Sequence, residues 1–363
     1  MSTWPDWLPI RKDIANLSPY GAPQIRDVVA LNTNENPFSI PEEISSEILK
    51  ALPTVIENLN RYPDRDAINL RKLLSEYVND SNQFKFEYEN IWAANGSNEI
   101  IQTLFLTFGS EGAIGFIPSY SMHQLIAQIC GVKWTSGSRG PDFELNLDNA
   151  KSLITENKPS LIFVTTPNNP TGNSIKYSEL SELARIAKSV KALLIIDEAY
   201  AEFSSEKSGL ALISEFPNVV IVRTMSKAFA LAGARLGYLV ADKDLVKALL
   251  LTRLPYHLSA PTQAIAAVAL KNRVALQKEV ELLKIERERV RESLIKWGFK
   301  VVSSDSNFLL FSGFRGSSEE VWRGLLDKNV LIRDVGIPNH LRVTIGTPDE
   351  NNQFLAAISS YKQ

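Results

Sequence analysis

The stretch LIFVTTPNNPTG, from Leu161 to Gly172, joins a short apolar run to a cluster of turn residues, and this pattern decides the fold. The pattern occurs three more times, where the apolar runs AIGFI, LLII and VVIV are followed by PSY, DEAY and RTMSK. Amphipathic helical stretches separate the runs, which is typical of buried parallel strands joined by crossover helices. The sequence therefore predicts an α/β fold with a mostly parallel sheet.

The four polar clusters are predicted to lie close together, although they span about a hundred residues of sequence. Ligands of open α/β sheets bind outside the carboxyl ends of the parallel strands, and each cluster follows such an end. A fifth cluster, NGSNE, precedes a predicted helix that stops at Gly109. The backbone N–H groups at the start of that helix would offer an anion site.

The two ends of the chain differ from this central region in their pattern of apolar and turn-forming residues. Four prolines and little periodicity in the first thirty residues predict an extended arm, residues 1–30. Towards the C-terminus, a long amphipathic helix that stops at Gly298, followed by the candidate strands FKVV, NFLLF and LRVTI, predicts a smaller α+β domain. We expect a large domain over residues 53–262 and a discontinuous small domain over residues 31–52 and 263–363.

Composition and charge exclude several classes of protein. The net charge of −2 and the lack of a dense Lys/Arg run give no reason to expect a nucleic-acid partner. The three histidines lie far apart without metal-ligand spacing, so no metal site is expected. No segment has the apolar length of a membrane span, the N-terminus lacks the apolar core of a signal peptide, and the single cysteine, Cys130, suits a reducing compartment. The sequence predicts a cytoplasmic protein with small-molecule substrates.

Each polar cluster taken alone has a structural interpretation: PNNPTG as a turn, DEAY and NGSNE as helix caps, and RTMSK as a strand end with a solvated lysine. Together they offer what pyridoxal phosphate needs. A lysine amine could form a Schiff base, and a carboxylate could keep a heterocyclic nitrogen protonated. Hydroxyls, an arginine and helix N–H groups could hold a phosphate. The candidates for these roles are Lys227, Asp197, Thr224, Ser226, Arg235, Ser97 and Asn98.

The motifs NPTG, DEAY, SK and the arginine at 235 resemble the signature of pyridoxal-phosphate-dependent aminotransferases of fold type I. LNTNENP, RYPD, SKAFALAGARLGY, LIRD and LRVTIGT are similar to the histidinol-phosphate aminotransferases within that family, from about Leu17 to the C-terminus. The resemblance implies an α/β/α sandwich beside a smaller α+β domain. It also implies transamination between L-histidinol phosphate and 2-oxoglutarate, giving imidazole-acetol phosphate and L-glutamate, in histidine biosynthesis.

The resemblance implies a role for each cofactor-site residue. Lys227 would bind the cofactor covalently and later move the proton between the substrate carbon and the cofactor. Asp197 would pair with the pyridinium nitrogen, Asn169 and Tyr200 would hydrogen-bond the phenolic oxygen, and Tyr120 would stack on the ring. The phosphate would be bound by Ser226, Arg235 and the turn at Ser97 and Asn98, with Thr224 close by.

The resemblance also implies how substrates are bound and how subunits associate. Arg342 would pair with the carboxylate of glutamate or 2-oxoglutarate, and Arg333 would be a second arginine at the anion end. Tyr20 and Asn34 would close over the substrate. Tyr62 in RYPD would reach the cofactor phosphate of a neighbouring subunit, which predicts a homodimer with shared active sites; in a purely structural interpretation it is a turn anchor.

Two departures from the family pattern leave alternatives open. Asn98 stands where many members have aspartate, and His123 stands where a tyrosine is common. His123 could approach the substrate's imidazole or be a packed helix residue. The alternative functions are an aromatic-amino-acid aminotransferase, a phosphothreonine decarboxylase and a non-catalytic module on the same fold.

Overall fold

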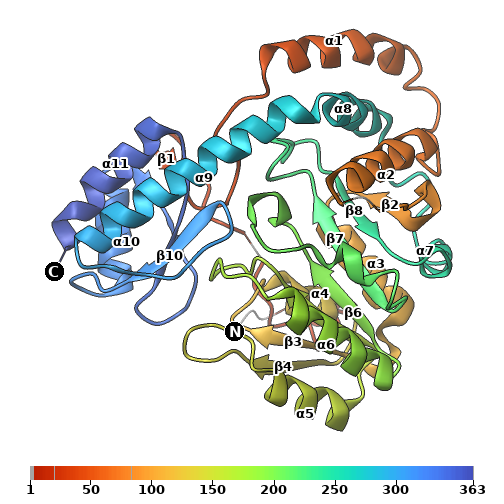
Figure 1. The fold of residues 1–363 in the computed structure, drawn as a ribbon, viewed down its shortest axis with the longest axis horizontal. Helices are drawn as coiled ribbons and strands as arrows, with labels where there is room; N and C mark the ends of the chain where they lie inside the picture. Colours follow the sequence, from red (N-terminus) through yellow and green to blue (C-terminus); the bar gives the residue numbers. More distant parts are fainter. Residues whose placement is uncertain (1–3, 20, 83, 363) are drawn as a thin grey trace.

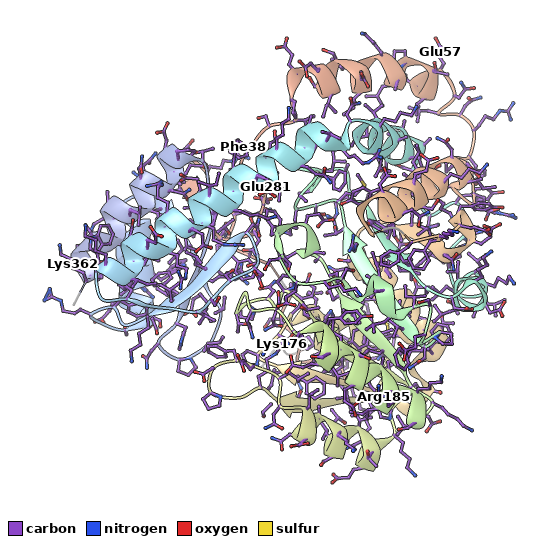
Figure 2. All side chains as sticks on the ribbon, viewed as in Figure 1. Phe38, Glu57, Lys176, Arg185, Glu281 and Lys362 are labelled. Carbon is purple, nitrogen blue, oxygen red and sulfur yellow. The ribbon has the colours of Figure 1, made fainter. Side chains whose placement is uncertain are left out.

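The computed structural model describes residues 4–19, 21–82 and 84–362, which form two sheets of unequal size and a short strand pair, with helices around them (Figure 1). Charged side chains such as those of Glu57, Arg185 and Lys362 project outward from the ribbon (Figure 2). Within the described ranges, every helix is too short or too polar to cross a bilayer.

The larger sheet has seven strands in the order β2-β8-β7-β6-β5-β3-β4. Neighbours from β7 to β4 are parallel, whereas β8 runs antiparallel to both β7 and β2. The predicted runs are confirmed as β3, β5, β6 and β7. The bounds are β2 Ile91–Ala94, β3 Ala113–Ile117, β4 Trp134–Ser138, β5 Leu161–Thr165, β6 Leu193–Asp197, β7 Val219–Thr224 and β8 Gly237–Val240.

Alternate side chains of each central strand enter two different hydrophobic cores. In β7, Val220 and Val222 belong to the core that contains Phe105 of helix α3 (Ser97–Phe108). Val219 and Ile221 belong to the core that contains Leu183 of helix α6 (Tyr177–Ser189). A strand buried on both faces needs an apolar residue at every position, which is why these runs do not alternate with polar residues. The sheet is therefore the middle layer of an α/β/α sandwich, as the sequence predicts.

The smaller sheet is antiparallel in the order β12-β13-β10-β9, and the parallel pair β1-β11 lies outside both sheets. The predicted strands FKVV, NFLLF and LRVTI correspond to β9, β10 and β13. The bounds are β1 Val29–Ala30, β9 Lys300–Val301, β10 Phe308–Ser312, β11 Val330–Leu331, β12 Arg333–Asp334 and β13 Leu341–Thr344.

The predicted long helix is α9, which runs from the end of α8 to the smaller sheet and ends before Gly298, whose φ of 88° suits glycine (Figure 1). Its apolar face buries the residues expected from the 3.6-residue period, among them Leu276, Val280 and Leu283. The helix bounds are α1 Glu42–Glu57, α2 Ile68–Asn82, α3 Ser97–Phe108, α4 Met122–Ile129, α5 Leu147–Asn157, α6 Tyr177–Ser189, α7 Lys243–Leu249, α8 Ala260–Lys271, α9 Arg273–Lys296, α10 Ser318–Leu326 and α11 Pro348–Ile358.

The predicted domain boundaries at 52/53 and 262/263 both fall inside helices, α1 and α8. These helices pack against each other. The division between domains stays a prediction. Within the described part of the arm, regular structure begins at Val29. The arm rests on the end of α4, where the Arg11 guanidinium donates to the Ile129 carbonyl oxygen at 2.8 Å.

Candidate active site

A cavity of about 690 Å³ lies at the carboxyl ends of β5, β6 and β7 and is also lined by β12 and β13. The carboxyl ends converge because neighbouring parallel strands end at the same edge of the sheet. The structure brings most of the predicted site residues to this cavity: Asn34, Ser97, Asn98, Tyr120, Asn169, Asp197, Tyr200, Thr224, Ser226, Lys227, Arg235, Arg333 and Arg342.

Lys227 lies just beyond β7, and its Nζ donates to the Thr33 carbonyl oxygen at 3.0 Å. The pKa of the Lys227 amine is lowered to about 8, chiefly by burial and also by the positive charges of Arg342 and Arg235, while Glu35 opposes the shift. A lysine with such a pKa is partly neutral at physiological pH, and only the neutral amine has a lone pair for bond formation or proton transfer.

Asp197 ends β6, and its side chain is buried beside His123 of α4. His123 Nε2 lies 3.0 Å from Asp197 Oδ2, and the backbone N–H of Ala199 donates to Oδ1 at 3.2 Å. The carboxylate is therefore held on both oxygens and faces the cavity with a defined orientation. His123 is packed, as one of its two interpretations had it, but its contact with Asp197 was not foreseen.

Tyr200 lies at the centre of a polar network on the cavity wall. Its hydroxyl oxygen accepts from Asn34 Nδ2 at 2.9 Å and lies 3.5 Å from Asn169 Nδ2. Asn169 Oδ1 in turn accepts from Arg342 Nη1 at 2.6 Å, and Asn34 Oδ1 accepts from the Thr344 hydroxyl at 3.0 Å. The network joins Asn34 and Arg342, both predicted to bind substrate, to Tyr200 and Asn169, both predicted to contact the cofactor.

The start of α3 has the properties of a phosphate site. Gly96, with a φ of 81°, precedes the helix and has no side chain to cap it, so the first-turn N–H groups need another partner. A Cβ at Gly96 would lie 2.7 Å from Arg235 Nη2, so the arginine packs directly on the glycine. The Thr224 and Ser226 hydroxyl groups, 3.0 Å apart, line the same cavity. This donor set fits a phosphate dianion.

Both departures from the family pattern have clear positions. Asn98, in the first turn of α3, accepts a hydrogen bond from the Tyr120 hydroxyl at 3.2 Å through Oδ1. An aspartate oxygen would accept the same bond, so the amide keeps the contact. His123 follows Tyr120 by three residues, with the two rings edge to face and their centroids 5.4 Å apart.

Arg333 and Arg342 are brought side by side by the pairing of β12 with β13, where they are opposite each other in register. Arg342 Nη2 donates to the Asn32 carbonyl oxygen at 2.8 Å, and its guanidinium lies 5.1 Å from the centre of the Phe308 ring. Both arginines line the cavity, which gives it a second region suited to anions.

One predicted site residue within the described ranges, Tyr62, does not line this cavity. Tyr62 is 80% exposed and stacks on Tyr256 with ring centroids 4.5 Å apart, away from the cavity lining of its own chain. Tyr20 lies outside the described residues. Residues that sequence reasoning did not select also line the cavity, among them Asn32, Thr33 and Gly96.

Comparison with known proteins gives one family. The family model described as aminotransferase class I and II matches residues 26–358. A protein named histidinol-phosphate aminotransferase, from Mycobacterium marinum (strain ATCC BAA-535 / M), is 48% identical over 355 residues, which cover 97% of this chain and 92% of that protein.

Solved structures share the fold. The histidinol-phosphate aminotransferase from Clostridium acetobutylicum superposes with a TM-score of 0.82 at 26% identity and covers 91% of this chain and 98% of that one. The histidinol-phosphate aminotransferase from Sinorhizobium meliloti, solved in complex with pyridoxal-5'-phosphate, superposes with a TM-score of 0.80 at 21% identity, which is a likeness of fold; it covers 93% of this chain and 91% of that one.

Proposed function

The chain belongs to the aminotransferase class I and II family, and on this premise we propose that it interconverts L-histidinol phosphate and 2-oxoglutarate with imidazole-acetol phosphate and L-glutamate, in histidine biosynthesis. The observation that carries the proposal is the place of Lys227. Its amine is within electrostatic reach of Arg235 at one anion-binding region and of Arg342 at the other. A reactive amine between two anion sites suits a phosphorylated cofactor on one side and an anionic substrate on the other.

We propose pyridoxal phosphate as the cofactor, because the donor set of the cavity fits it. The phosphate would be bound by the first turn of α3, Arg235 and the hydroxyl groups of Thr224 and Ser226. Asp197 would pair with the ring nitrogen, and the Tyr200 hydroxyl with Asn169 Nδ2 would bind the phenolic oxygen. Tyr120 would stack on the ring. When bound, the cofactor would supply an electron sink for the pair left by breaking the substrate's Cα–H bond.

The residues of the chain supply the rest of the chemistry. Lys227 Nζ, neutral in part at physiological pH, would accept the proton from the substrate carbon and return it to the cofactor side. His123 would keep the Asp197 carboxylate oriented through the 3.0 Å contact. Arg342 would pair with the substrate carboxylate in the first half-reaction, while Asn169 and Asn32 hold its guanidinium in place.

The substrate proposal is tested by single-turnover measurements of the change in cofactor absorbance. We expect histidinol phosphate to react at least about tenfold faster than phenylalanine at equal subsaturating concentration, since two arginines at the substrate end favour a phosphate dianion over a singly charged carboxylate. The variant Arg333→Gln should remove most of this preference, and the exposed Arg323→Gln on α10 is the matched control. A faster reaction with phenylalanine would instead identify an aromatic-amino-acid aminotransferase.

The lowered pKa of Lys227 predicts a pH dependence for cofactor attachment. Because the folded-state pKa is about 8, the neutral fraction of the amine rises as pH increases up to 8 and then levels off. We expect the rate at which the cofactor-free protein takes up pyridoxal phosphate to rise about tenfold per pH unit below that point. Stopped-flow absorbance between pH 6 and 10 measures the rate. A rate that continued to rise up to pH 10 would show that the pKa of Lys227 is that of an ordinary lysine.

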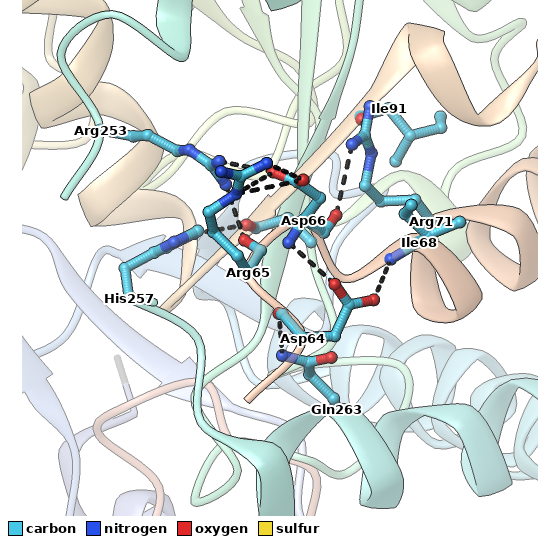
Figure 3. A network of polar contacts seen from close by, with 10 residues as sticks. Asp64, Arg65, Asp66, Ile68, Arg71, Ile91, Arg253, His257 and Gln263 are labelled. Atoms are coloured by element: carbon cyan, nitrogen blue, oxygen red, sulfur yellow. Dashed lines mark hydrogen bonds and ion pairs between the residues drawn. The ribbon is translucent and has the colours of Figure 1, made fainter. Parts of the chain in front are cut away.

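We further propose that the protein is a homodimer in which Tyr62 completes the partner's phosphate site. In support, Tyr62 and its stacking partner Tyr256 are both exposed, and so are the apolar residues Leu59, Leu251 and Leu254, which lie close to them in the sequence. The segment between α1 and α2, which carries Tyr62, is held by two contacts. Asp66 pairs with Arg253 at 2.5 Å, and the side chain of Asp64 caps the start of α2 (Figure 3). A sedimentation experiment that found only monomers at catalytic concentrations would contradict this proposal.

We propose a cytoplasmic location for this biosynthetic activity. The support is the single cysteine, Cys130, which is a free thiol. A thiol without a possible disulfide partner in the chain suits a reducing compartment. Fractionation of cells, with the protein detected outside the cytoplasmic fraction, would count against it.

A further inference from the structure

Two pairs of adjacent residues, Asp197-Glu198 and Arg223-Thr224, lie at the carboxyl ends of neighbouring strands β6 and β7. Side chains alternate between the faces of a strand. Asp197 and Thr224 accordingly line the active-site cavity, whereas Glu198 and Arg223 line a second cavity of about 580 Å³ on the other face. Glu198 and Arg223 are thus each joined by a peptide bond to a residue that lines the active-site cavity.

Glu198 and Arg223 form an ion pair with many contacts. Arg223 donates to Glu198 Oε2 from Nε at 3.1 Å and from Nη2 at 2.8 Å. Ser208 donates its hydroxyl to the same carboxylate, and the Gly209 backbone N–H donates to Oε1 at 2.7 Å. The side chains of Glu198 and Arg223 are 2% and 5% exposed. Burial opposes the charge of Arg223, but the adjacent Glu198 carboxylate raises the pKa of Arg223 well above its ordinary value.

Contacts with the backbone restrict where the Glu198–Arg223 ion pair can lie. The Glu198 backbone N–H continues the ladder between the strands by donating to the Val222 carbonyl oxygen at 2.8 Å. At Gly209, a Cβ would lie 2.8 Å from Ile196 Cδ1 and 3.0 Å from Ile221 Cδ1, so a larger residue there would have to displace the ends of these two side chains. The pair therefore ties β6, β7 and the 208–209 loop together at one point.

Stability alone does not account for this arrangement. A buried ion pair contributes little net stability compared with apolar side chains of similar size, because both charges lose their hydration. Separating the two partners is costly in free energy, because it leaves a buried charge without its partner. The pair therefore holds its two strands at a defined spacing. The active-site consequence is direct, because Lys227 follows Arg223 by only four residues and Asp197 precedes Glu198.

We propose that Glu198 and Arg223 are positioning residues, which set the spacing between Asp197 and Lys227 from the face of the sheet opposite the cofactor. The inference rests on the proposed function, because it is a statement about how the proposed cofactor site is kept in shape. Neither side chain contacts the active-site cavity, and both act through the residues next to them.

The test uses Glu198→Asp, which keeps the charge and shortens the side chain by one methylene. We expect the dissociation constant for pyridoxal phosphate to rise about tenfold and kcat to fall, with KM for glutamate little changed. Absorbance titration of the cofactor-free protein measures the first, and steady-state kinetics the others. The matched control is Glu286→Asp on α9, whose carboxylate pairs with Arg289 at 2.7 Å away from both cavities.

A purely structural role would lower the melting temperature and leave the dissociation constant and kcat at the wild-type values, and that result would overturn the proposal. If Glu198→Asp does not fold, Arg223→Lys, which keeps the charge and loses one of the two donors, is measured in the same way and judged by the same results. Failure of the wild-type protein to bind pyridoxal phosphate would refute the proposed function instead, so the two failures are distinguishable.

Discussion

Replacement of Lys227 by alanine is expected to lower kcat for transamination by about 10⁴-fold, at the upper end of what loss of a general acid–base group costs. The reason is that the cavity offers this amine a depressed pKa of about 8 and a fixed position against the Thr33 carbonyl oxygen. The phosphate-binding groups remain, so pyridoxal phosphate should still bind, but reversibly. Single-turnover absorbance with glutamate measures the chemical step, and dialysis measures retention of the cofactor.

The matched control for this variant is Lys243→Ala, because Lys243 is an exposed lysine on α7 paired with Glu87. Its kcat should stay within about twofold of the wild-type value. Repeated turnover by Lys227→Ala at a rate near that of Lys243→Ala would refute the proton-transfer role. Retention of cofactor through dialysis would refute the covalent bond to this lysine.

Asp197→Asn is expected to lower kcat by about 10³-fold, comparable to the loss of one preorganised electrostatic contact at a reacting centre. The amide is nearly isosteric and can keep the 3.0 Å contact with His123, but it carries no charge to keep the ring nitrogen protonated. KM for glutamate should change much less than kcat, because Arg342, and not Asp197, is the group proposed to bind the substrate carboxylate. Single-turnover kinetics and the melting temperature separate the two effects.

The control for the second variant is Asp148→Asn, an exposed aspartate in the first turn of α5. The kcat of His123→Gln should lie between those of Asp197→Asn and Asp148→Asn, since this change loosens the Asp197 side chain without removing its charge. A kcat for Asp197→Asn equal to that of the control would contradict an electrostatic role for the carboxylate.

The fold was predictable because its signals are local. A strand that is buried on both faces needs consecutive apolar residues, and AIGFI, LIFVTT, LLII and VVIV all have them. The polar residues that follow each run then placed the clusters at the strand ends, independently of any resemblance to a family. Their roles in catalysis stay predictions, but their gathering around one cavity is a property of the structure.

Contacts between distant parts of the chain were not predictable. His123 carries a weak signal, since it follows Tyr120, a predicted ring-stacking residue, by three residues. Nothing in the sequence says that its side chain meets Asp197, 74 residues later. Likewise, Asn34 was expected over the substrate, and only the structure shows its amide against the Tyr200 hydroxyl, 166 residues away.

The sequence by itself determined the class of fold and the family, and it predicted which groups meet the proposed cofactor, because apolar periodicity and short motifs act within a few residues. Only the tertiary structure decided how those groups are held: the lowered pKa of Lys227, the contact of His123 with Asp197, and the ion pair of Glu198 with Arg223. The physical reason is that desolvation and charge pairing depend on which side chains surround a group in space. That environment arises only when strands and helices from across the chain pack together.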